Sequence, residues 1–73
     1  MLDRITVNPE RCSGQPTIRN LRITVDFILK LLGSGLNASE IVADYPELEL
    51  EDIYQSARYG AWLASESTTL VVA

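Results

Sequence analysis

The sequence predicts a mainly α-helical single domain, in which a short N-terminal β-hairpin leads into three helices and a short strand ends the chain. Before residue 24, short runs that alternate apolar and polar residues are separated by turn-forming residues, a pattern typical of strands. From residue 24 to 64, apolar residues recur at helical spacing. Leu70, Val71 and Val72 then form a strand-like run. We therefore place the β-hairpin segment at residues 1–23, the three-helix bundle at 24–64 and a C-terminal strand or tail at 65–73.

The hairpin segment is predicted from two short runs. The first is Ile5–Val7, which alternates apolar and polar residues, and the second covers residues 17–19. Residues 13–16 between them are typical of a turn. Asn20 tolerates the left-handed region better than most residues, and residues 21–23 continue extended. This part of the chain therefore predicts two or three short strands joined by tight turns.

Capping residues set the start of the first two helices. Thr24 can accept a hydrogen bond from the first turn of a helix whose apolar stripe begins at Val25. Asn37 precedes the second helix, at about residues 38–44, and Glu40 three residues later completes the pattern of a capping box. The sequence thus predicts two short helices with defined N-termini.

The third helix is predicted to run from Leu50 to about Ala64 and to carry two stripes. One face holds apolar residues at Leu50, Ile53, Ala57 and Ala64, with Tyr54 and Ala61 beside them. A second stripe, at i, i+4 and i+8, is formed by Tyr54, Arg58 and Trp62. Two interpretations of these rings stay open. They cover the hairpin as core residues, because aromatic residues at helical spacing are usually buried, or Trp62 lies at a subunit interface, where Trp is enriched.

Composition limits the chemistry available to the chain. The 73 residues are 47% apolar and 22% charged, which is typical of a soluble globular domain. The chain has no His and a single Cys, Cys12, so an intramolecular disulfide is excluded and neither a metal site nor a cofactor is expected. Gly33, Ser34 and Gly35 end a helix and lack the Lys of a phosphate loop. We therefore expect no enzyme activity and no small-molecule substrate.

Size and hydropathy bear on partners and location. A domain this small buries only about 60% of the surface of its unfolded chain, which leaves it marginally stable alone. We expect a homodimer, or a complex with another protein, to supply further burial. The sequence contains neither a signal peptide pattern nor an apolar run long enough to cross a membrane, so we expect a cytoplasmic protein without membrane contact.

The net charge of −4 is unevenly distributed along the chain. Basic residues outnumber acidic ones in the first 30 residues, whereas residues 31–73 carry Arg58 against seven acidic side chains. If DNA is bound, the candidate contacts are therefore the arginines of the hairpin segment, which are Arg4, Arg11, Arg19 and Arg22.

An ordered series of short motifs runs through the chain. The motifs are Gly14-Gln15-Pro16-Thr17-Ile18-Arg19, Arg22-Ile23-Thr24-Val25, an apolar helix ending at Gly35, Glu40-Ile41, Asp44-Tyr45-Pro46-Glu47-Leu48 and Glu51-Asp52-Ile53. Taken together and in this order, the series resembles the family called domain of unknown function 433, over about residues 4–62.

The resemblance implies a β-hairpin followed by a homeodomain-like or winged-helix-like bundle, in which the helices at about residues 38–44 and 50–64 form a helix-turn-helix. Members of the family are mostly bacterial, and they are commonly regarded as VapB-like antitoxins that pair with PIN-like ribonuclease toxins. The family usually has a Thr or Ser cap before the third helix, where this chain has Glu49. The charge of Glu49 still suits the helix dipole.

The resemblance and the composition together favour a small interaction protein. We expect a type II antitoxin that binds and neutralises a PIN-like ribonuclease toxin and also represses its own operon. Because exposed aromatic rings and unpaired strand edges are typical of protein contacts, the candidate interface residues are Trp62, Tyr54, Arg58, Leu70, Val71 and Val72.

The alternative is a DNA-binding transcriptional regulator that acts on operator DNA without a toxin. A helix-turn-helix places the start of its second helix in the major groove. Here that start carries Glu47, Glu49, Glu51 and Asp52 with no arginine near them in the sequence. DNA phosphates would repel such a cluster, so the antitoxin hypothesis is preferred.

Overall fold

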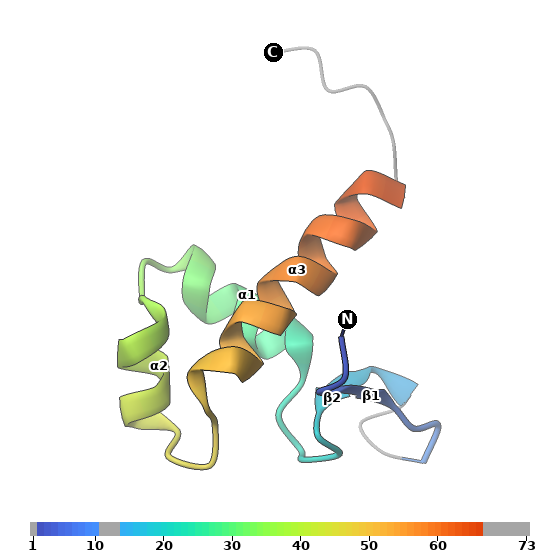
Figure 1. The fold of residues 1–73 in the computed structure, drawn as a ribbon, viewed down its shortest axis with the longest axis horizontal. Helices are drawn as coiled ribbons and strands as arrows, with labels where there is room; N and C mark the ends of the chain where they lie inside the picture. The colour runs from blue at the N-terminus through green and yellow to red at the C-terminus, as the bar shows by residue number, and fades with distance from the viewer. Residues whose placement is uncertain (1, 11–13, 67–73) are drawn as a thin grey trace.

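Helices dominate the described part of the chain, which comprises residues 2–10 and 14–66 of a computed structural model. In chain order, the elements are β1 (Ile5–Val7), β2 (Pro16–Ile18), α1 (Val25–Gly33), α2 (Ala38–Asp44) and α3 (Leu50–Glu66) (Figure 1). The prediction of an N-terminal hairpin followed by three helices is confirmed for these residues. The predicted C-terminal strand, with Leu70, Val71 and Val72, lies outside the described residues, as does Arg11.

The hairpin is a two-stranded antiparallel sheet within the described residues. β1 pairs with β2 in the register Ile5 to Ile18, Thr6 to Thr17 and Val7 to Pro16. Residues 21–23, which we expected to stay extended, instead follow a tight turn and return to β2 through one isolated bridge between Thr17 and Thr24.

The turn after β2 depends on two left-handed residues. Asn20 has φ 62°, which confirms its predicted tolerance of that region, and Arg19 has φ 46°, which the sequence did not predict. Leu21 N donates to Ile18 O at 2.7 Å, and Ile18 N donates to Ile23 O at 3.0 Å. These bonds turn the chain toward α1. They leave the Arg19 side chain beside the start of α3, where it reaches Asp52.

The predicted caps of α1 and α2 are confirmed. Thr24 Oγ1 accepts from Phe27 N at 3.1 Å at the start of α1. At the start of α2, Asn37 Oδ1 accepts from Glu40 N, and Glu40 Oε1 accepts from Asn37 N, each at 2.9 Å. Each cap satisfies backbone amides that a helix N-terminus otherwise leaves without partners.

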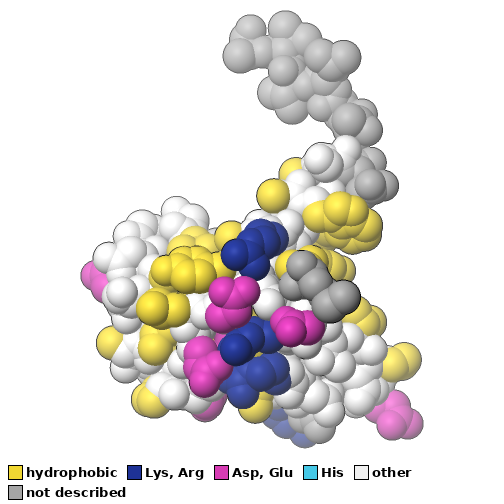
Figure 2. Space-filling view, viewed as in Figure 1, with side chains coloured by type: hydrophobic (Ala, Val, Ile, Leu, Met, Phe, Trp, Pro, Cys, Tyr) yellow, Lys and Arg dark blue, Asp and Glu magenta, His cyan; other side chains and the backbone are white. Residues whose placement is uncertain are grey.

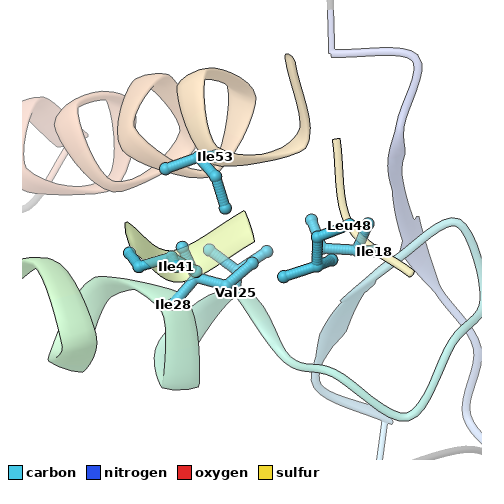
Figure 3. Packing of buried hydrophobic residues seen from close by; sticks show 6 residues of the cluster. All are labelled: Ile18, Val25, Ile28, Ile41, Leu48 and Ile53. Carbon is cyan, nitrogen blue, oxygen red and sulfur yellow. The ribbon is translucent and has the colours of Figure 1, made fainter. Parts of the chain in front are cut away.

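The core lies where the three helices meet β2. Its buried hydrophobic residues come from β2, α1, α2, the connection before α3 and α3 itself, and they are Ile18, Val25, Ile28, Ile41, Leu48 and Ile53. In Figure 3, Ile53 points from α3 toward Ile28 and Ile41. A Cβ atom at Gly60 would lie 3.0 Å from Leu29 Cδ1, so α1 and α3 approach closely at that glycine.

Of the apolar residues that the sequence placed on one face of α3, only Ile53 is buried. Leu50, Ala57 and Ala64 are exposed. The interpretation that the aromatic stripe covers the hairpin as core is also wrong for Tyr54 and Trp62, because both rings are about half exposed. The side of α3 that faces the bundle is instead largely polar, and the C-terminal turns of the helix project beyond the bundle (Figure 1).

Candidate functional site

The inward side of α3 carries buried polar residues in place of a hydrophobic stripe. Asp52, Gln55 and Ser56 are almost fully buried. Ser56 Oγ donates to Asp52 O at 2.8 Å, within the helix. Gln55 Oε1 accepts from the backbone N of Arg4 at 2.9 Å, and Gln55 Nε2 donates to Asp3 Oδ1 at 2.8 Å. α3 therefore holds the N-terminal segment by hydrogen bonds.

Asp52 is the centre of this polar cluster. Arg19 binds its carboxylate in a bidentate manner, with Nε 3.2 Å from Oδ1 and Nη2 2.9 Å from Oδ2, and Arg4 Nη1 lies 3.1 Å from Oδ1. Glu49 N donates to Asp52 Oδ2 at 2.7 Å, so Asp52 caps its own helix from the third position. The carboxylate is fully buried but has charge-assisted bonds from two chain segments and the helix start.

The arginines and carboxylates of the cluster stabilise each other's charged forms. Burial on its own raises the pKa of Asp52, but the bonds from Arg19, the Glu49 amide and Arg4 outweigh it and lower the pKa below its ordinary value. Bonds to Glu49 and Asp52 raise the pKa of Arg4. At the edge of the cluster, hydrogen bonds from Gln55 and Arg58 lower the pKa of Glu51. The contacts therefore favour the charged forms of Asp52, Arg4 and Glu51.

Two of the candidate DNA-binding arginines, Arg4 and Arg19, belong to this polar cluster. Arg4 contacts both Glu49 and Asp52, and Arg19 contacts Asp52 and donates to Glu47 O at 2.7 Å. Arg22 is exposed on the turn that follows. No arginine is near the carboxylates at the start of α3 in the sequence, but the fold brings Arg4 and Arg19 to them. Figure 2 shows basic and acidic side chains alternating in a band on one face, and no uniform basic patch there.

The outward side of α3 carries a row of exposed apolar residues. Leu50 is 43% exposed and Tyr54 is 48% exposed, and Ala57, Ala61 and Ala64 continue the same side of the helix. Arg58 and Glu51 flank this stripe and form an ion pair at 3.1 Å. The predicted interface residues Tyr54 and Arg58 therefore lie together, on one side of α3.

The projecting end of α3 carries a second apolar group. Trp62 is 53% exposed and Leu63 is 42% exposed, and the ring of Tyr59 lies 5.8 Å from the Trp62 ring. By helical spacing, Leu63 continues the inward side of α3 into the turns that project beyond the bundle (Figure 1). Trp62 thus lies apart from the stripe that includes Tyr54.

Other kinds of site have no counterpart in the part of the chain that the structure describes. Residues 2–10 and 14–66 enclose no pocket and contain no group of His, Cys, Asp or Glu arranged to hold a metal ion. Among the same residues, no helix is both long enough and apolar enough to span a membrane.

Comparison with known proteins agrees with the fold. Residues 5–60 match the family described as protein of unknown function (DUF433). The chain is also similar to the crystal structure of a DUF433 member protein from Anabaena variabilis ATCC 29413, with a TM-score of 0.80 and 31% sequence identity. The similarity covers 88% of this chain and 63% of that chain, so this chain spans less than two thirds of its length. No curated protein matches the chain.

Proposed function

The chain belongs to the DUF433 family of proteins of unknown function, and from that premise we propose that it is an interaction protein, an antitoxin that binds and neutralises a PIN-like ribonuclease toxin. The proposal follows the resemblance described above and is supported by the side chains of α3. Toward the bundle, that helix buries Asp52, Gln55 and Ser56 beside Ile53, and its outward side carries exposed apolar residues. An exposed apolar helix surface on a small domain is typical of a protein contact.

The projecting end of α3 is the part of the surface that we assign to the ribonuclease. Trp62 and Leu63 are both large and about half exposed, and Tyr59 supports the Trp62 ring from one side. Tryptophan is among the residues that contribute most to binding energy at interfaces. The exposed parts of the Trp62 and Leu63 side chains are therefore available to a partner protein.

The charge of the chain suits the same partner. A ribonuclease that binds RNA needs a basic rim around its cleft, and a protein with net charge −4 has the opposite sign. Glu49 and Glu51 are partly exposed at the start of α3, with side chains 64% and 42% exposed. We expect these charges to speed association and to make it sensitive to salt more than to determine the final affinity.

Replacing Trp62 tests the proposed contact. When the chain is co-expressed with a PIN-like ribonuclease from the same genome, the two should copurify, and the ribonuclease should lose activity on RNA. Trp62→Ala should weaken the complex by about thirtyfold or more, as expected for an aromatic residue that contributes about 2 kcal/mol to binding. Titration calorimetry measures the change.

Val7→Ala is the matched control for that experiment. Val7 is an exposed hydrophobic residue on β1, away from α3, so its replacement should leave the affinity unchanged. If the chain and the ribonuclease do not copurify, and ribonuclease activity is unchanged, the antitoxin proposal is rejected. Equal losses from Trp62→Ala and Val7→Ala would reject the assignment to the end of α3.

Operator binding is the alternative function, and one feature favours it. α2 and α3 are consecutive helices joined by a short connection, residues 45–49, which is slightly longer than the three- or four-residue turn of a helix-turn-helix. The charges are unfavourable, because Glu47, Glu49 and Glu51 surround the start of α3 and the nearby arginines already bind carboxylates. A gel shift with the promoter of the chain's own operon at low salt decides the matter: a shift that salt abolishes supports repression, and no shift excludes it.

A further inference from the structure

We propose that the outward apolar stripe of α3 pairs with the same stripe of a second copy of this chain, in an antiparallel arrangement that places Leu50 opposite Ala61, and Tyr54 opposite Ala57, of the other copy. This dimer rests on the proposed function in one respect, which is that the chain is an interaction protein. It uses the stripe and leaves the Trp62 end to the ribonuclease.

The spacing of the stripe is the first observation. Leu50, Tyr54, Ala57, Ala61 and Ala64 follow one another at steps of four, three, four and three residues. A mean step of 3.5 residues is the repeat by which two helices keep the same seam in contact along their length. The bundle cannot be the reason for this repeat, because the stripe is exposed and the opposite side of α3 faces the bundle.

The sizes of the side chains select the antiparallel direction. The first two members of the stripe, Leu50 and Tyr54, are large, and the members that follow are alanines. In an antiparallel pair, each large side chain lies opposite an alanine, so the two helix axes are equally far apart at both ends of the contact. In a parallel pair, Leu50 would meet Leu50 and alanine would meet alanine. The helices would then diverge at one end and leave gaps in the seam.

The charges beside the stripe select the register. Glu51 and Arg58 lie on the same flank, one heptad apart, with side chains 42% and 56% exposed. In the proposed register, Glu51 of each copy lies beside Arg58 of the other, so the ion pair that forms within the chain is repeated between chains. A shift by one heptad would bring Arg58 of the two copies together, and like charges across a seam are unfavourable.

The length of the contact sets the expected strength. The overlap from Leu50 to Ala61 is about 17 Å long at 1.5 Å per residue. A contact of that length and one helix in width is at the small end of the range for specific interfaces. We therefore expect a dimer that dissociates in the micromolar range and that is visible by sedimentation equilibrium of the full chain between micromolar and millimolar concentrations.

Charge reversal tests the pairing between chains. Glu51→Arg and Arg58→Glu should each weaken the homodimer by about tenfold or more, because each variant places like charges at both contacts. An equimolar mixture of the two variants should dimerise better than either variant alone, because both contacts between the chains of the mixed dimer are again opposite in charge. A mixture no more dimeric than its parts, or a wild type that stays monomeric at all concentrations, would overturn the proposal.

A glutamate scan along the stripe tests the register. Ala57→Glu should abolish the dimer, whereas Ala64→Glu, the same substitution on the same stripe but beyond the overlap, should retain it. Both sites are exposed, so neither variant should unfold, which circular dichroism checks. The opposite pattern would overturn the register. Trp62→Ala should keep the dimer while it loses the ribonuclease, so that failure of one proposal is distinguishable from failure of the other.

Discussion

Asp52→Ala is expected to lower the free energy of unfolding by about 3 kcal/mol, the lower part of the range for removing one member of a buried ion pair. The carboxylate is fully buried and bonds to Arg19, to Arg4 and to the Glu49 amide. Its loss removes the cap of α3 and leaves the two guanidinium groups without their shared partner. Because those groups are partly exposed, water offsets some of the loss. Urea unfolding followed by circular dichroism measures it.

Two variants separate the parts of this effect. Asp52→Asn keeps the shape of the side chain and an acceptor oxygen but removes the charge. Its free energy of unfolding should therefore lie between those of the wild type and Asp52→Ala. Glu49→Gln changes the exposed partner of Arg4 and should cost less than about 1 kcal/mol, as exposed ion pairs do. If Asp52→Ala lowered the free energy of unfolding by no more than Glu49→Gln does, Asp52 would not be the residue that joins the hairpin to α3.

The stability of the fold should fall at acid pH. The pKa of Asp52 in the folded chain is lower than its ordinary value of 3.8, so its charged form stabilises the fold above that pH. This contribution is lost as the pH falls through the folded-state pKa. The wild type should therefore lose stability steeply below about pH 4. The curve for Asp52→Asn should be flatter in that range, because the variant has no carboxyl group there to protonate.

Ile53→Ala is expected to destabilise the fold by about 3 kcal/mol, because it deletes a fully buried side chain from the centre of the core. Leu50→Ala removes a similar amount of hydrocarbon from the same helix, one turn earlier. It should change the unfolding free energy by less than about 0.5 kcal/mol at concentrations where the chain is monomeric, because Leu50 is exposed.

This pair of variants measures which side of α3 faces the bundle. Both replacements give alanine, the best helix former, so helix propensity does not produce the difference. Thermal unfolding of dilute samples records it. Similar losses from the two variants would mean that Leu50 is also buried, and the outward stripe would then have no basis.

Most of the architecture follows from local signals in the sequence. The capping pairs at Thr24 and at Asn37 with Glu40 identify where α1 and α2 begin, because a capping side chain acts within its own turn. The alternation at Ile5–Val7 identifies β1, and the tolerance of Asn20 for positive φ identifies a turn. Each of these depends on a few neighbouring residues, and each is confirmed.

The orientation of α3 could not be predicted in the same way. Its apolar residues outnumber its polar ones on the outward side, and periodicity alone assigns such a side to a core. Contacts between residues far apart in the sequence determine which side of α3 faces the bundle. Arg4 and Arg19 approach Asp52 from the hairpin and make a polar inward side favourable. One signal was available, since Asp52 stands three residues after Glu49, the spacing at which an acidic side chain caps a helix.

Backbone amide NMR of the full chain tests most directly whether the outward side of α3 is a contact surface. Spectra recorded from micromolar to millimolar concentration should shift at Leu50, Tyr54, Ala57 and Ala61. The amides of Ile53 and Ser56, which lie inward on the same turns, should shift much less. Spectra that do not change with concentration, or shifts confined to the hairpin and α2, would contradict this account.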